Sequence, residues 1–263
     1  MKNYYLARTL AIVNRFPTLK TYRRRLQSLL RNLYPLSTNK ELIRLGPEGD
    51  GGYLVPNDLV GIQACFSPGV NFESGFEQDC TELGMKVFLA DKSVDGQAVK
   101  NELFHFTKKF VGVTSNDDFM TLDNWVTSSL PEKYTDLLLQ IDIEGYEYEV
   151  FLSTSNTLMQ RFRIIVAEFH SLHMLWSWPF FKLAGRAFEK ILQTHSCVHI
   201  HPNNYQSHLQ MNGLDIPLVM EFTFLRNDRI ENPSYQKKFP NPLDYDNNPN
   251  DITLSLPKCW YEG

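Results

Sequence analysis

Short apolar runs alternate with longer segments of helical periodicity through most of the chain. Runs that are almost wholly apolar, such as 137–141, are typical of parallel strands covered on both faces. The alternation therefore predicts a doubly wound α/β sheet. The predicted strands are 61–66, 86–90, 110–113, 137–143, 164–169, 197–201 and 218–225. The predicted helices are 76–83, 121–129, 148–152 extended towards Met159, and 180–193.

The two ends of the chain have different patterns. Near the N-terminus, leucines and one tyrosine recur at steps of three and four, as on an amphipathic helix that Pro35 would end. These positions are Leu19, Tyr22, Leu26, Leu29, Leu30 and Leu33. We therefore expect a helical arm in residues 1–40 and the main domain in residues 41–263. Residues 232–250 are rich in Pro and Asn, which predicts an irregular surface segment.

Composition narrows the class of protein. The 263 residues are 43% hydrophobic and 13% aromatic, which fits a packed globular domain and excludes collagen and low-complexity disorder. No apolar run reaches the roughly 18 residues of a membrane span, and the first residues lack the pattern of a secretory signal. The four cysteines are far apart without a CxxC pair, so we expect neither disulfides nor a zinc site. A soluble, cytoplasmic protein is expected.

Charge is distributed unevenly. Residues 1–40 hold nine basic side chains and no acid, so the remaining 17 basic and 30 acidic side chains give the rest of the chain a net charge of −13. Two interpretations of the arm stay open. Its leucines pack on the main domain with the basic face in water, or the arm docks on an anionic membrane or another polyanion. The acidic remainder argues against a nucleic-acid partner.

In a doubly wound sheet, ligands bind beyond the carboxyl ends of the strands. After the first predicted strand come Ser67 and Gly69, in a turn small enough for backbone to approach a ligand. Asp91 follows the second strand, 22 positions after Gly69, close to the spacing of about 20 for an acid that binds ribose hydroxyls. The alternative for Asp91 is a helix cap.

The most specific group of candidate functional residues follows the fourth and fifth predicted strands. Strand alternation places Asp142 and Glu144 on one face, and Glu168 and His170 on one face of the next strand. If these strands are neighbours, three carboxylates and an imidazole converge. Clustered carboxylates repel unless a ligand, cation or proton compensates them. His170 is a candidate general base; the alternative is a purely structural pair with a carboxylate.

Other polar groups lie at the same carboxyl ends of the strands or in the loop that precedes the sheet. His201 and Asn203 follow the sixth strand and are expected to contact substrate. His195, His199, His201 and His208 do not match a known metal-ligand spacing, so no metal is predicted there. The glycine-rich loop 46–52 contains Asp50 next to Gly51, which favours a hairpin turn, although a lid or an anion cradle also fits.

The motifs of the sequence, taken in order, resemble those of FkbM-type methyltransferases. These are class I enzymes dependent on S-adenosylmethionine (SAM). The resemblance covers roughly residues 41–226. The segments that carry it are Gly49–Tyr53, Ser67–Val70, Phe72–Glu73, Asp91, Thr121–Asp123, Asp142–Glu147 and Glu168–His170.

The resemblance implies a Rossmann-like, seven-stranded, mostly parallel sheet with an antiparallel hairpin at one edge. It places Ser67 and Gly69 at the amino-acid part of SAM, Asp91 at the ribose, and Ser115 in the segment beside the adenine. As an alternative to acting as the base, Asp142 would hold the ammonium group of SAM. The sequence departs from the family in its cofactor turn, which has one glycine instead of two or three.

The predicted function is transfer of a methyl group from SAM to a hydroxyl of a sugar, a glycan or a related small molecule. His170 is the preferred base, with Asp142 and Glu144 as the other candidates. Glu168, His201, Asn203 and Asp50 are the predicted acceptor contacts. A divalent ion could bridge Asp142 and Glu144, but none is predicted.

Other functions stay open at this stage. A glycosyltransferase that uses a nucleotide sugar, and a non-catalytic SAM-binding or membrane-tethered module, are the alternatives. An NAD-dependent enzyme should carry a fuller Gly-x-Gly-x-x-Gly.

Overall fold

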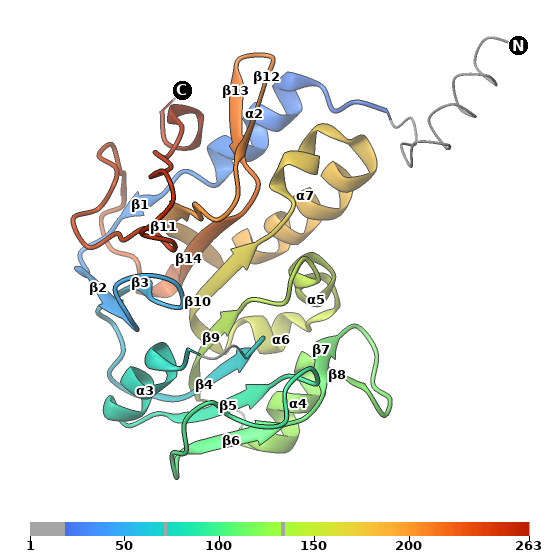
Figure 1. The fold of residues 1–263 in the computed structure, drawn as a ribbon, viewed down its shortest axis with the longest axis vertical. Helices are drawn as coiled ribbons and strands as arrows, with labels where there is room; N and C mark the ends of the chain where they lie inside the picture. Colours follow the sequence, from blue (N-terminus) through green and yellow to red (C-terminus); the bar gives the residue numbers. More distant parts are fainter. Residues whose placement is uncertain (1–18, 71–72, 133–134, 263) are drawn as a thin grey trace, which may run out of the picture.

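The computed structural model describes residues 19–70, 73–132 and 135–262, and Figure 1 shows their arrangement. Expectations for residues 1–18 of the arm, and for Asn71 and Phe72 of the family motif, lie outside the described residues. None of the helices in the described ranges combines the length and apolar character needed to cross a bilayer.

A seven-stranded sheet forms the centre of the molecule, in the order β11-β14-β10-β9-β4-β5-β6. Strand β14 is antiparallel to both of its neighbours, and the other pairs are parallel. This confirms the predicted Rossmann-like class I fold with an antiparallel pair at one edge. The strands are β4 (Ile62–Pro68), β5 (Lys86–Ala90), β6 (Phe104–Thr107), β9 (Asp136–Ile141), β10 (Phe162–Phe169), β11 (His195–Pro202) and β14 (Met220–Arg226).

The strand order reverses beside β4. The chain first runs outward through β5 and β6, and then returns to the other side of β4 with β9 and β10. Such a reversal opens a crevice at the carboxyl ends of the strands, here between β4 and β9. In Figure 1 the arrowheads of the parallel strands end at the right side of the view, so the site is expected there.

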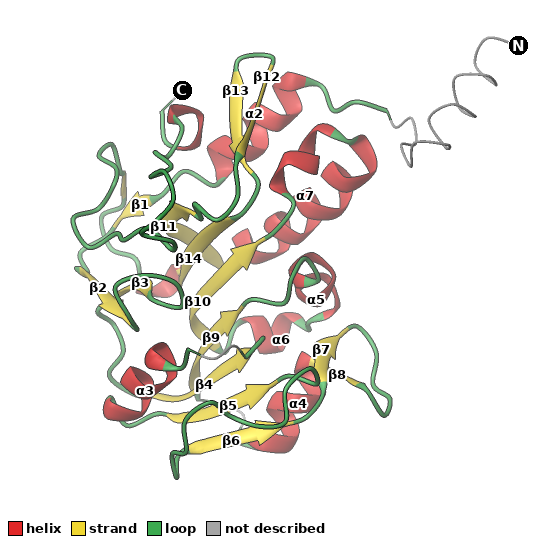
Figure 2. Cartoon of the chain, in the orientation of Figure 1, coloured by secondary structure: helices red, strands yellow, loops and turns green. Residues whose placement is uncertain are grey.

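Helices lie on the faces of the sheet (Figure 2), and two hydrophobic clusters pack between the helices and the sheet. One cluster joins the sheet to the helices that follow β8, β9 and η1, and the other joins the opposite face to α3 and the β2–β3 hairpin. The helices are α3 (Gly75–Glu82), α4 (Leu122–Ser129), α5 (Glu147–Ser153), α6 (Asn156–Met159) and α7 (Trp178–Leu192), with short 3-10 turns η1 (Leu172–Trp176), η2 (Asn227–Arg229) and η3 (Lys258–Trp260). Each predicted helix is present, although the third is broken into α5 and α6.

One predicted strand was assigned wrongly. The segment expected at 110–113 forms β7 (Phe110–Gly112), which pairs in parallel with β8 (Phe119–Thr121) outside the main sheet. The third strand of the main sheet is instead β6, beside β5. The four residues of β6 are too short a run to show a clear alternation, whereas Phe110-Val111 is conspicuously apolar.

Two-stranded ribbons surround the main sheet. The predicted hairpin around Asp50 is confirmed, since β2 (Leu42–Leu45) pairs antiparallel with β3 (Tyr53–Pro56). Two further pairs were not predicted from sequence. They are the β12–β13 hairpin (His208–Met211 and Leu214–Pro217) and the β1–β15 pair (Leu36–Ser37 and Ser234–Tyr235).

The described part of the arm packs on the domain. Helix α2 (Arg23–Asn32) buries Leu26, Leu29 and Leu30 in the larger hydrophobic cluster. Full burial of a leucine contributes about 1.5–3 kcal/mol, which anchors this helix. Leu19 and Tyr22 precede the helix and are 74% and 76% exposed, so the apolar face is shorter than the spacing predicted.

The segment at 232–250 is irregular, as expected, but it is not merely a surface excursion. The side chain of Asp244 is only 4% exposed, and Asn247 is buried. Both reach hydrogen-bond partners on the sheet, described below. The surface interpretation was wrong because polar side chains can be buried when other polar groups satisfy them, and composition does not show those partners.

Candidate functional site

A pocket of about 540 Å³ lies at the carboxyl ends of β4, β5 and β9. It occupies the crevice that the strand order predicts. Its lining combines apolar side chains with three acids, a mixture that is typical of small-molecule sites. Its lining residues are Gly69, Val70, Ala90, Asp91, Ser93, Phe110, Val111, Phe119, Asp142, Ile143, Glu144 and Tyr146.

Gly69 forms the floor of this pocket. Its φ of +94° is a left-handed conformation that L-residues rarely adopt, and a Cβ there would lie 1.5 Å from the backbone oxygen of Asp142. The turn after β4 and the turn after β9 are therefore in direct backbone contact. In this chain a single glycine, Gly69, provides the close approach between the two turns.

Asp91 lies at the edge of the pocket, directly after β5. Its Oδ1 accepts hydrogen bonds from the backbone and the hydroxyl of Ser93, both at 2.6 Å. This is a local turn rather than a helix cap. One carboxylate oxygen is thus committed to the loop, and Oδ2 is left to accept from a ligand's hydroxyl groups.

Two predicted cofactor residues are not part of the pocket lining. The Ser67 hydroxyl is buried and lies 2.6 Å from Glu77 Oε1 and 2.7 Å from Gln140 Oε1. Ser115 accepts from the Thr121 backbone and from the Asn124 amide. Both hydroxyls hold protein segments together, and the phenylalanines that line the pocket are Phe110 and Phe119.

The turn after β9 presents the first two acids. Strand β9 ends at Ile141, earlier than predicted, and Glu144 adopts a left-handed φ of 57°. Asp142 and Glu144 therefore lie in a turn rather than on one face of a strand. They still point to a common neighbour, because the turn folds back over the end of β10.

That neighbour is His170, which follows β10 directly. Its Nε2 lies 3.8 Å from Asp142 Oδ1, 3.5 Å from Glu144 Oε2 and 3.7 Å from Glu168 Oε1. The predicted convergence of three carboxylates and one imidazole is thus seen in the structure. A fourth acid was not predicted: Glu147 Oε1 lies 3.3 Å from the other ring nitrogen, Nδ1.

These contacts shift the protonation of the cluster. Burial raises the pKa of Asp142 to about 7, the neighbouring carboxylates add to the rise, and His170 opposes it. Burial lowers the pKa of His170, but Glu147, Asp142 and Glu144 together hold it above the usual 6.5. Burial raises the pKa of Glu168 well above its usual range. Asp142, Glu168 and His170 are therefore all shifted towards their protonated forms.

Glu168 belongs to a buried polar network behind the site. It lies directly opposite Glu221 on β14, and its Oε1 accepts from the Asn203 amide at 3.0 Å. Glu221 accepts from Asn247 at 2.7 Å, and Asn247 also donates to Asp50 at 3.3 Å. Among these, Glu221 and Asn247 were missed from sequence. A lone acid within the apolar run of β14 was the available signal for Glu221.

His201 does not line the 540 Å³ pocket. It is buried, and its Nδ1 is 3.7 Å from Asp244, which also accepts from His199 at 2.9 Å. Burial opposes ionisation of Asp244, yet both imidazoles hold its pKa well below its usual range. His199, His201 and Asp244 thus tie the C-terminal segment to β11. No pattern in the sequence pointed to Asp244.

Asp142, Glu147 and His170 each offer one atom within 4.8 Å of the others. Within the described ranges, they are the one set of three side chains with this metal-compatible spacing. The histidines on β11 do not form such a set. A divalent cation bound to this set, or a proton on His170, would each offset part of the negative charge of the acids.

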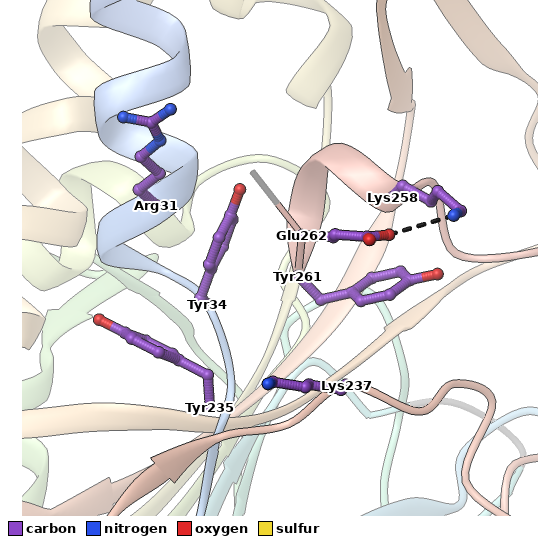
Figure 3. Close-up of a pocket in the computed structure, with 7 residues that line it drawn as sticks. All are labelled: Arg31, Tyr34, Tyr235, Lys237, Lys258, Tyr261 and Glu262. Atoms are coloured by element: carbon purple, nitrogen blue, oxygen red, sulfur yellow. Dashed lines mark ion pairs between the residues drawn. The ribbon is translucent and has the colours of Figure 1, made fainter.

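A larger pocket, of about 820 Å³, lies where the end of α2, β15 and η3 meet (Figure 3). Three tyrosines and three basic side chains line it, and Lys258 pairs with Glu262 at 3.1 Å. Its larger volume does not identify this pocket as the active site. None of its lining residues belongs to the acid–imidazole cluster, and its lysines and Arg31 are exposed side chains.

Comparison with known proteins identifies the domain. No curated protein matches the chain. Among solved structures, it is similar to a protein of Anabaena variabilis named as a methyltransferase from an antibiotic biosynthesis pathway. The two share 12% identity with a TM-score of 0.31, over 71% of this chain and 67% of that one, a likeness too distant to bear on the site. Residues 70–199 match the family model of the methyltransferase FkbM domain. This match confirms the resemblance to FkbM-type methyltransferases that the motifs predicted.

Proposed function

We propose that the protein transfers a methyl group from SAM to a hydroxyl of a sugar, a glycan or a related small molecule. One observation carries this proposal. Asp142 and Glu144 line the 540 Å³ pocket and also lie within 3.8 Å of His170. The cofactor pocket and the acid–base cluster therefore share a wall, so a bound methyl donor would lie next to a proton acceptor.

The residues of the pocket fit SAM. Asp91 offers a carboxylate oxygen to the ribose hydroxyls, and Phe110 and Phe119 offer apolar surface to the adenine. Asp142 has a buried oxygen without a hydrogen-bond partner among the described residues, which suits an ammonium group. When bound, SAM supplies a methyl group on a cationic sulfur, which leaves as a neutral thioether while the acceptor oxygen gains the methyl and loses its proton.

His170 takes that proton in the proposed reaction. A hydroxyl is a weak nucleophile, and a positioned base typically contributes roughly 10²–10⁴-fold to such a step. Neutral His170 accepts the proton on Nε2, and the resulting imidazolium is stabilised by the carboxylates around it. Positioning of the two reactants contributes up to roughly 7–11 kcal/mol, and Asp142 and Glu144 are placed to orient them.

The acceptor would lie over this cluster. Glu144 is 86% exposed at its side chain and can accept hydrogen bonds from hydroxyl groups of a sugar. Of the other predicted acceptor contacts, Asp50 is partly exposed, while Glu168, His201 and Asn203 are buried. We propose that Asp50 and Glu144 contact the acceptor. The three buried residues would instead hold the surrounding structure in place.

Calorimetry with SAM, NAD and a UDP-sugar tests the proposal. SAM is expected to bind with a dissociation constant on the order of 1 μM, within the usual range for enzyme substrates. In Asp91→Asn the amide oxygen still caps the Ser93 turn, but the charged acceptor for ribose is lost. The affinity for SAM should fall at least tenfold, because a hydrogen bond to a charged group is worth about 1.5–3 kcal/mol.

Asp95→Asn is the matched control, since this exposed acid pairs with Lys108 and does not line the pocket. It should bind SAM like the unmodified protein. Binding of the UDP-sugar without SAM would refute methyl transfer and favour a glycosyltransferase. SAM binding without methylation of any hydroxyl-bearing acceptor would favour a non-catalytic module.

We also propose a peripheral contact between α2 and an anionic membrane. Its leucines are buried, but Arg23, Arg24 and Arg31 are exposed, so the contact would rest on charge alone. Each basic side chain contributes about 1 kcal/mol near an anionic surface. We expect binding to phosphatidylserine vesicles at low salt, loss of binding at high salt or in Arg23→Glu/Arg24→Glu, and no binding to neutral vesicles. Binding that survives the double variant would contradict the contact.

A further inference from the structure

Glu147 is a fully buried acid at the first turn of α5, with no exposed surface. Its Oε1 accepts hydrogen bonds from the backbone nitrogens of Ile143, at 2.9 Å, and Gly145, at 3.1 Å. These bonds close the turn that carries Asp142 and Glu144. The carboxylate is therefore fixed in place by the backbone and cannot swing towards solvent.

The same oxygen faces the proposed base. Glu147 Oε1 is 3.3 Å from His170 Nδ1, whereas Nε2 faces Asp142, Glu144 and Glu168. The backbone of His170 is held from the same helix, because its carbonyl accepts from the Tyr148 hydroxyl at 2.6 Å. Two consecutive residues of α5 thus set the position and the orientation of the imidazole.

The two ring nitrogens have different surroundings. Nδ1 faces one immobile, buried carboxylate, and Nε2 faces the acids that adjoin the cofactor pocket. A neutral imidazole carries one proton, and its partner decides which nitrogen holds it. A fixed carboxylate next to Nδ1 favours the proton there, leaving the lone pair on Nε2. The contact, at 3.3 Å, is slightly longer than an ordinary hydrogen bond.

We propose that Glu147 is a positioning residue that keeps the proton of neutral His170 on Nδ1, so that Nε2 is free to accept the proton of the acceptor hydroxyl. This inference rests on the proposed function. In the step, the O–H bond breaks, its electron pair stays on the acceptor oxygen, and the proton binds Nε2. The imidazolium then lies between Glu147 on one side and Asp142 and Glu144 on the other.

The rival explanation is a purely structural role, in which Glu147 only closes the turn through its two backbone contacts. Glu147→Gln separates the two, because the amide oxygen can still accept from Ile143 and Gly145 while the charge is lost. Glu144→Gln is the matched control. It removes an equal charge, from an exposed side chain that faces Nε2 instead of Nδ1.

The test is ¹⁵N NMR of imidazole-labelled protein, with His170 assigned by comparison with His170→Ala. Above the pKa of His170, the unmodified protein should show the proton on Nδ1. In Glu147→Gln the tautomer should move towards Nε2–H, and the pKa should fall by about one unit, since a nearby opposite charge shifts a pKa by about 1–3 units. Glu144→Gln should keep the Nδ1–H tautomer.

Turnover provides the second readout. In Glu147→Gln, kcat should fall at least roughly tenfold, because the proton of neutral His170 moves to Nε2 and blocks the accepting nitrogen. The affinity for SAM should stay the same, because the turn keeps its two backbone hydrogen bonds. The inference is overturned if unmodified His170 carries its proton on Nε2, or if a folded Glu147→Gln keeps the tautomer and pKa. Selective broadening of the His170 signals by micromolar Mn²⁺ would also overturn it, since Glu147 would then be a metal ligand. The NMR result does not depend on turnover. Failure of the proposed methyl transfer can therefore be distinguished from failure of the role assigned to Glu147.

Discussion

His170→Ala should lower kcat by roughly a hundredfold or more while SAM still binds, because the variant loses the proposed proton acceptor and leaves the pocket lining intact. Steady-state kinetics with a hydroxyl-bearing acceptor, together with calorimetry of SAM binding, measure both quantities. A loss confined to kcat is the signature of a group that acts in the transition state and not in cofactor binding.

The same base dictates the pH dependence. His170 must be neutral to accept a proton, so kcat/KM should rise with pH and level off above the pKa of His170. Burial lowers that pKa, but Glu147, Asp142 and Glu144 raise it above 6.5, and Glu168 also faces the ring. Activity is therefore expected to be lost as the pH falls through a value above 6.5, and His170→Ala should abolish this limb of the profile.

His208→Ala is the control for His170→Ala. His208 lies on the β12–β13 hairpin, is largely exposed and is not part of the cluster, so its removal should leave kcat unchanged. Near-normal turnover of a folded His170→Ala would contradict the assignment and move the proton-accepting role to Asp142 or Glu144.

Gly69→Ala should lower the affinity for SAM by roughly a hundredfold, since displacements of about 1 Å at a site can cost that much. A Cβ at Gly69 would lie 1.5 Å from the backbone oxygen of Asp142, so the turns after β4 and β9 must separate. Both turns line the cofactor pocket. Calorimetry with SAM and thermal unfolding of the variant measure the loss of binding and the loss of stability.

Gly84→Ala isolates the steric part of this effect. Gly84 has a similar φ of +85°, but a Cβ there meets nothing within 4 Å. Both variants carry the left-handed strain of roughly 1–2 kcal/mol, and only Gly69→Ala carries the overlap. Gly84→Ala should therefore bind SAM normally. Equal SAM affinity in the two variants would show that the contact between the turns does not shape the pocket.

Much of the fold could be predicted because its strands are buried on both faces. Nearly continuous apolar runs mark β4, β5, β9, β10 and β14, and their alternation with helical periodicity indicates a doubly wound sheet. Strand β6 at the edge of the main sheet was missed, because a strand of four residues has too little periodicity to stand out. Short ribbons such as β12–β13 depend on pairing partners that local sequence does not reveal.

The sequence by itself determined which residues could take part in the chemistry. It placed Asp91, Asp142, Glu168 and His170 at the ends of three predicted strands, and parallel strands bring their carboxyl ends to one rim. That argument needs only chain order and the covalent geometry of a strand. It could not assign partners, so the engagement of Ser67 with Glu77 and Gln140 could not be foreseen.

Only the tertiary structure decided how these groups meet. The left-handed turn at Glu144, the backbone contact at Gly69 and the burial of Glu147 depend on packing between segments far apart in the chain. The same holds for Asp244, whose histidine partners are more than 40 positions away. Protonation follows from burial and from charges within a few ångströms, and both are properties of the folded chain, not of any local pattern.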